Sequence, residues 1–159
     1  MSYFRTKRNC ELSTVEYIRT QVNLTWSGVT VVKSFKEAYS NTIALPVICV
    51  RMTDTVTVRR EVGSNLLDST YNLIVDIFAK SDGQRMDLAD FLLDTLKDGW
   101  TYNVYAHVSG DSTSIEGTDS GRVTLTSFIE DRKIDLGDNV DVRDKHRHLL
   151  SFSVRVGLS

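Results

Sequence analysis

The chain is poor in the residues that cross-link a fold or bind a soft metal. It has two cysteines, Cys10 and Cys49, and three histidines among its 159 residues. Two cysteines are too few for a disulfide framework or a cysteine-based zinc site. Cys49 falls inside the apolar run Val47–Met52, so we expect a buried thiol that packs as a small hydrophobic side chain. This cysteine usage is typical of a protein made in a reducing cytoplasm.

Long apolar runs and an excess of one charge are also missing. No stretch approaches the ~20 apolar residues that cross a bilayer. Residues 1–9 are basic, but no apolar core of a secretory signal follows them. The 19 basic and 21 acidic residues give a net charge of −2, which argues against a dedicated surface for duplex nucleic acid. The sequence therefore predicts no membrane partner and no more than a passive contact with DNA.

Recognisable catalytic motifs are absent from the sequence. It has no nucleophile elbow, phosphate loop, glycine-rich dinucleotide turn or H-E-x-x-H zinc motif. His146 and His148, with Asp141 and Asp144 nearby, are the best candidates for a metal-dependent hydrolase. A solvated basic stretch before the last strand explains them more simply. We predict that the chain is not an enzyme and has no catalytic residue, metal or cofactor.

Proline occurs once, at Pro46, where it marks the start of a strand. Proline cannot donate a ladder hydrogen bond, which suits the first position of a strand. The near-continuous apolar run Val47–Met52 predicts cover on both faces of that strand. After Thr53 the pattern changes to valine alternating with threonine, followed by charged residues. We expect residues 53–69 to form a β-hairpin arm that leaves the body of the protein.

The strand that follows the arm, Tyr71–Lys80, carries bulky apolar residues on both faces. It is therefore expected to be a central strand of the sheet. Asp76 lies on this strand between Ile74 and Phe78 on the same face. A carboxylate buried there must be paired or have a shifted pKa, and we expect an arginine partner.

The first of two expected helices begins near Asn9 to Ser13. Ser13 and Glu16 have the spacing of a capping box, in which each side chain reaches the other residue's backbone N–H. Residues 1–9 are then a flexible tail. A stripe at helical spacing predicts the buried face of this helix: Leu12, Val15, Ile18 and Val22.

The second expected helix is Arg85–Lys97. Ser81 and Gln84 form a capping pattern before it, and Gly99 suits the left-handed residue after it. We expect Met86 to lie near the start of the buried stripe. The remaining members of that stripe are Ala89, Leu92, Leu93 and Leu96.

The remaining strands complete a single α+β domain over residues 1–159. They are expected over Val29–Phe35, Tyr102–Val108, Val123–Ile129 and Leu149–Val156. Residues 109–121 and 131–148 are polar and are expected to be two long loops. The prediction is a mixed, mostly antiparallel sheet of about five or six strands, flanked by two helices and carrying the arm.

The arm is also the main candidate for contact with other copies or partners. An isolated two-stranded ribbon is marginal in water, and an unpaired strand edge is open to another chain. Charged side chains near its end supply complementarity without a large hydrophobic patch. The candidate interface residues are five on the arm and three basic residues of the second loop. They are Val56, Val58, Arg59, Arg60 and Glu61, and then Arg143, Lys145 and Arg147.

The order of elements resembles the tail terminator (tail completion) proteins of long-tailed bacteriophages, the family of lambda minor tail protein U. The matching elements, in chain order, are the helix Leu12–Val22, a short strand, the proline-opened strand Leu45–Val50, the charged excursion Arg59–Glu61, the strand Tyr71–Lys80, the helix Arg85–Lys97 and the closing strand Leu149–Val156.

The resemblance implies a structural virion protein of the tail or neck, assembled in the host cytoplasm. It implies a ring of identical subunits, commonly a hexamer, that terminates the tail tube and joins it to the head-side connector or stopper protein. It implies no cofactor and no catalytic residue. Two other functions stay open: another neck, connector or completion component, and the small metal-dependent hydrolase. A monomeric binding module has no positive feature in the sequence.

Overall fold

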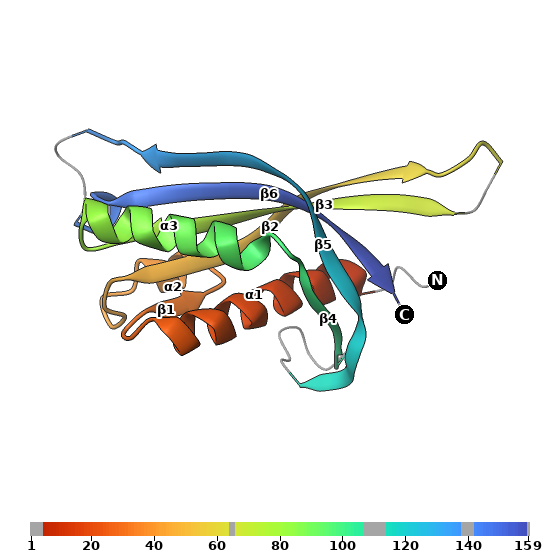
Figure 1. Cartoon of the computed structure of the whole chain (residues 1–159), viewed down its shortest axis with the longest axis horizontal. Coiled ribbons are helices and arrows are strands. Elements are labelled where there is room, and N and C mark those ends of the chain that lie inside the picture. The colour runs from red at the N-terminus through yellow and green to blue at the C-terminus, as the bar shows by residue number, and fades with distance from the viewer. Residues whose placement is uncertain (1–4, 64–65, 107–113, 138–141, 159) are drawn as a thin grey trace.

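The computed structural model describes residues 5–63, 66–106, 114–137 and 142–158. Within these ranges the fold is α+β, with three α-helices, one 3-10 turn and six strands (Figure 1). In chain order the elements are α1 (Thr6–Thr25), β1 (Thr30–Val32), α2 (Phe35–Ala38), β2 (Val47–Arg59), β3 (Leu67–Phe78), α3 (Asp82–Leu96), β4 (Trp100–Tyr105), β5 (Ile115–Ile134), the 3-10 turn η1 (Val142–Asp144) and β6 (Arg147–Leu158).

The six strands form one sheet in the order β1-β2-β3-β6-β5-β4. Only the β1–β2 pair is parallel among the described strands; the other neighbours are antiparallel. This confirms a mixed, mostly antiparallel sheet. The expected central strand after the arm is β3, which pairs with β2 on one side and β6 on the other.

The main core lies between one face of the curled sheet and the helices α1 and α3 (Figure 1). The opposite face is covered at its β1–β3 end by α2 and the segment around it. A second cluster fills that space: Val32, Ala38, Val47, Cys49 and Phe78. The start of β2 is therefore buried on both faces, as its continuous apolar run predicts, and Cys49 is fully buried.

The structure corrects the start of the first helix, which begins at Thr6. Ser13 lies inside α1, so it does not cap a helix with Glu16. Its Oγ accepts a hydrogen bond from Asn103 N–H (3.0 Å) at the free edge of β4. Residues 6–9 are helical and not a flexible tail, whereas 1–4 lie outside the described residues. Hydrogen bonds of Asn9 with Tyr102 and Tyr105 of β4, more than ninety positions away in sequence, stabilise this extra turn.

The helix α1 also covers other strand edges with polar side chains. The Arg19 guanidinium donates to the Val31 carbonyl of β1 (3.2 Å). The Glu11 carboxylate accepts from the Met52 N–H of β2 (2.9 Å). Unpaired backbone groups on an edge strand invite pairing with another chain. Side chains of a single helix therefore protect edges of β1, β2 and β4.

The two long loops are shorter than expected. Residues 115–121 belong to β5, and 107–113 lie outside the described residues. Residues 131–134 also belong to β5, and 147–148 open β6. Pairing with β4 and β6 holds these polar segments in strands despite their loop-like composition.

Two predictions made from alternating apolar residues were also wrong in detail. The expected strand Val29–Phe35 contains only Thr30–Val32, because Phe35 begins α2. In β5 the register shifts twice, between Leu125 and Ser127 and between Phe128 and Glu130. The shifts change which side chains face the core, and Ile129 is therefore 56% exposed.

The helix α3 confirms the expected capping pattern, although it begins earlier, at Asp82. The Gln84 N–H donates to Ser81 Oγ (3.2 Å). Gly99 has a left-handed φ of 75°, as expected after the helix. Met86 does not belong to the buried stripe, because it is 50% exposed.

Replacing the Ser81 cap with alanine is expected to lower the free energy of unfolding by about 1 kcal/mol, because the Gln84 N–H loses its acceptor. Urea unfolding followed by circular dichroism measures the change. The control is S27A, since Ser27 is exposed and caps no helix. Equal losses in both variants would contradict a capping role.

Candidate assembly interface

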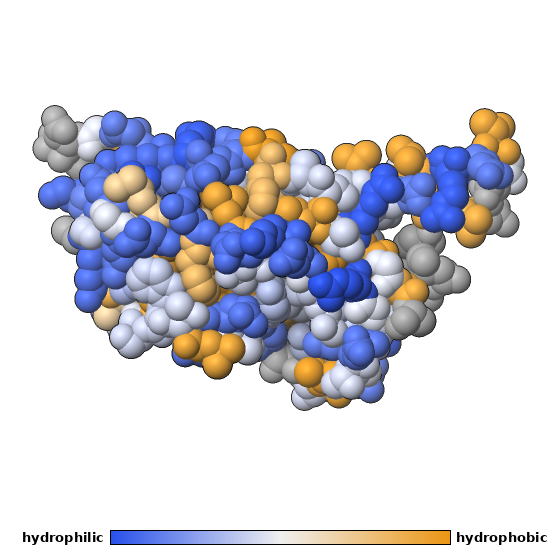
Figure 2. Space-filling model, in the orientation of Figure 1, coloured by the Kyte–Doolittle hydropathy of each residue, from blue (hydrophilic) through white to orange (hydrophobic). Residues whose placement is uncertain are grey.

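The arm is the part of β2 and β3 that projects beyond the body of the sheet (Figure 1). A register shift between Met52 and Thr55 marks its base. In its described residues, 53–63 and 66–69, it exposes four aliphatic side chains: Val56 (54%), Val58 (55%), Val62 (106%) and Leu66 (52%). Figure 2 shows hydrophobic atoms spaced along the arm among hydrophilic ones. The hairpin expected over residues 53–69 is confirmed.

The charged candidates on the arm lie beside these valines. Arg59 and Glu61 are exposed, and Arg60 forms an ion pair with Asp68 across the hairpin (2.8 Å). An exposed pair of this kind adds little stability. The arm therefore offers both apolar surface and charges of both signs to a partner.

The three remaining candidates lie at the opposite end of β3, where Arg147 pairs with Phe78. Arg143 donates to the backbone carbonyls of Ala38, at the end of α2 (2.9 Å), and of Ser40, just after it (2.7 Å). Lys145 is exposed. The structure thus separates the eight candidates into two groups, and their contact with a partner stays a prediction.

Asp76 has the arginine partner that the sequence predicts. It is fully buried, and its Oδ1 accepts two hydrogen bonds from Arg147, at 3.1 and 2.9 Å. Its Oδ2 lies 3.6 Å from Arg51 Nη2. The Arg51 guanidinium in turn lies 4.1 Å from the centre of the Phe35 ring. This network joins α2 to β2, β3 and β6, and its geometry is that of a structural ion pair.

A polar cluster at the start of α3 was missed from the sequence. The Asp82 carboxylate contacts Lys133 (3.1 Å), Arg85 (3.2 Å) and His146 (3.3 Å). Hydrogen bonds from these groups, led by that from Lys133, lower the pKa of Asp82 to about 2. The cluster ties α3 to β5 and to the start of β6.

His148 is buried beside this cluster. Its Nδ1 accepts from Arg85 Nη1 (2.6 Å), since a guanidinium can only donate, and its Nε2 faces the Asp131 carboxylate. Among the described residues there is no group of three or more His, Cys, Asp or Glu side chains that could hold a metal. Asp141, named as a potential ligand, lies outside them.

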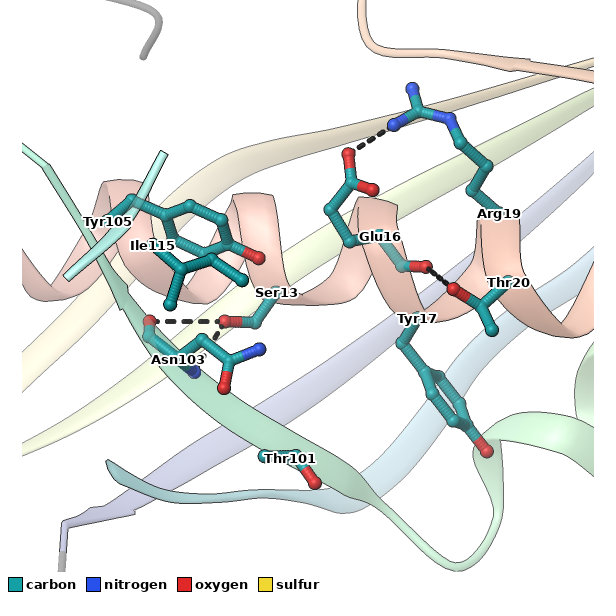
Figure 3. Close-up of a pocket in the computed structure, with 9 residues that line it drawn as sticks. All are labelled: Ser13, Glu16, Tyr17, Arg19, Thr20, Thr101, Asn103, Tyr105 and Ile115. Carbon is teal, nitrogen blue, oxygen red and sulfur yellow. Dashed lines mark hydrogen bonds and ion pairs between the residues drawn. The ribbon is translucent and has the colours of Figure 1, made fainter. Parts of the chain in front are cut away.

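A groove of about 540 Å³ lies between α1 and β4 (Figure 3). Most of its lining residues are polar, and several already bond to one another: the Asn103 backbone N–H donates to Ser13, and Glu16 pairs with Arg19. The described residues that line it include no His, Cys, Asp or Lys. Among the described residues of the lining, Glu16 is the only carboxylate, and it pairs with Arg19.

Comparisons with known proteins add no assignment. No protein-family model matches the chain, and no curated protein matches it. Within the described residues, no helix is long and apolar enough to span a membrane.

Proposed function

We propose that this protein is a structural subunit that acts through homo-oligomeric assembly. The arm is the observation that supports this function best, because its aliphatic side chains project from the body and remain at least half exposed. A surface that combines exposed valines, charges of both signs and an edge strand is suited to binding another protein chain.

The more specific proposal is a ring at the head–tail junction of a long-tailed phage. In this role, identical subunits, commonly six in the family it resembles, terminate the tail tube and bind the head-side connector or stopper protein. The element order along the chain and the confirmed α+β fold with its arm support it. The second candidate is another neck or completion component, which the same arm also suits.

Replacing Val56 and Val58 with aspartate is expected to weaken self-association by roughly 100-fold or more, because carboxylates replace apolar groups at the contact. Light scattering after size exclusion gives the mass of each species, and electron microscopy shows whether the wild type forms rings. Circular dichroism should show an unchanged fold, since both side chains lie on the exposed arm.

The matched control is L24D, which places a charge on an exposed leucine at the end of α1, away from the arm (76% exposed). This variant should assemble like the wild type. Normal assembly of the double arm variant would remove the arm from the interface. A wild-type chain that stays monomeric at all concentrations would overturn the proposed homo-oligomer.

A further inference from the structure

The outer edge of β2 is open along the arm. The parallel strand β1 covers β2 only over Val47–Cys49. In the hairpin, the Arg60 N–H donates to the Leu66 carbonyl of the opposite strand (3.0 Å). Bonded residues alternate along an antiparallel ladder, so the N–H and C=O groups of Thr55 and Thr57 point away from β3. No hydrogen bond to these backbone groups is present in the described part of the chain.

This edge lacks the protection that the rest of the sheet has. The edges of β1, β4 and the Met52 position of β2 receive side chains from α1. The arm extends beyond that helix (Figure 1). Its edge residues Thr55–Val58 include no proline and no charged side chain, which are common protectors of natural edge strands. The arm is therefore a strand edge suited to pairing with another strand.

One face of the arm carries a self-complementary row of side chains along this edge. Its members are Asp54, Val56, Val58 and Arg60. The register places the two valines opposite Thr70 and Asp68 of β3. The contacts of Asp54 with Asn72 (3.1 Å) and of Arg60 with Asp68 (2.8 Å) place both charged groups on the same face. The row thus begins with an anion, ends with a cation and has two aliphatic side chains between them.

We infer that this edge pairs with the same edge of a second copy, antiparallel, around a two-fold axis at Thr57. In that register each Val56 faces Val58 of the other copy, and each Asp54 faces the other Arg60. Apolar pairs and opposite charges across strands are both stabilising. A two-fold axis at Val58 would instead set Val56 against Arg60. Charge and apolar pattern therefore both select Thr57.

The inference rests on the proposed homo-oligomer and adds the contact through which two copies meet. A contact around a two-fold axis uses the same surface on both subunits, so it joins copies in pairs. An assembly that uses it throughout has an even number of copies. In a ring whose two faces differ, neighbours meet head to tail, so this two-fold contact would join copies that belong to two rings.

A single cysteine at the axis tests this pairing. In the T57C variant the two introduced thiols lie opposite each other, with Cα atoms about 5.5 Å apart, within the range of a disulfide. Both native thiols are fully buried, and burial raises the pKa of Cys10 and of Cys49 to about 12. Mild oxidation should therefore give a covalent dimer through residue 57, visible on a non-reducing gel.

The matched control is L24C, which places a cysteine on a side chain that is 76% exposed at the end of α1. T57C should cross-link roughly tenfold faster or more, because pairing raises the local thiol concentration. Equal rates would overturn the pairing. If T57C does not cross-link while the wild type still assembles, this contact is wrong but the proposed homo-oligomer stands. If the wild type is also monomeric, both are wrong.

The charge pattern gives a second test of the register. D54R sets a cation opposite Arg60 of the other copy and should slow the T57C cross-link. An unchanged rate in the T57C/D54R variant would contradict the register at Thr57.

Discussion

Replacing Asp76 with alanine is expected to lower the free energy of unfolding by about 3 kcal/mol. The change leaves Arg147 without the carboxylate that accepts two of its hydrogen bonds, and it removes the anion beside Arg51. The two arginine side chains are 17% and 33% exposed, so they recover part of their hydration. For this reason we expect the lower end of the range for breaking a buried ion pair. Urea unfolding measures the loss.

Two companion variants separate charge from volume at this position. D76N nearly keeps the size of the side chain but places a neutral amide beside the two guanidinium groups. Its free energy of unfolding should therefore fall by most of the amount expected for D76A. D54A removes an exposed carboxylate on the arm and should change stability by no more than about 0.5 kcal/mol. Similar losses in D76A and D54A would show that the buried network is not a major source of stability.

Replacing Trp100 with alanine is expected to cost more, about 4 kcal/mol. The indole is 1% exposed, stacks on Tyr17 (5.6 Å between centroids) and meets the edge of Phe152 (6.2 Å). Its Nε1 also donates to Thr14 Oγ1 (3.1 Å). Alanine would leave a cavity between α1 and the sheet and remove that hydrogen bond. Urea or thermal unfolding would show the loss.

The neighbouring T101A is the matched control, because Thr101 is exposed on the same strand. It should stay within about 0.5 kcal/mol of the wild type. W100F retains an aromatic ring and should lose less than W100A. If W100A is as stable as T101A, Trp100 does not anchor α1 to β4.

Local chemistry was enough to predict several elements. Pro46 precedes the strand that begins at Val47, and Ser81 caps α3. The change from apolar residues to alternating valine and threonine after Thr53 located the arm. An apolar setting for Asp76 predicted its arginine partner. Each of these signals depends on neighbours along the chain or on the general cost of burying a charge.

The errors arose where distant segments decide the structure. Residues 115–121 have a loop-like composition, yet Val104 and Tyr102 of β4 pair with Gly117 and Gly121. At Gly121 a Cβ atom would lie 2.2 Å from the carbonyl oxygen of Gly157. This glycine therefore permits close approach of β5 to β6. A single sequence cannot distinguish that role from a turn.

A row of polar residues at helical spacing marks the side of α1 that contacts β4. Arg5, directly before α1, and Asn9 and Ser13 within it recur every fourth residue, which is the spacing of one side of a helix. A polar row on a helix usually faces solvent, whereas here it contacts the backbone of β4. This role is visible only once the edge of β4 is known to lie beside the helix, and the spacing of residues in the sequence does not give that position.

The protection of strand edges by α1 has a consequence for the order in which the protein is made. The hydrogen bond from the Tyr105 N–H to Asn9 Oδ1 (3.1 Å) joins residues 96 positions apart. During synthesis α1 leaves the ribosome before β4, and Tyr105 is translated 96 positions after Asn9. Until then Asn9 and Ser13 have no β4 backbone to bind. The first helix of the chain therefore reaches its final hydrogen bonding late, when a distant strand arrives.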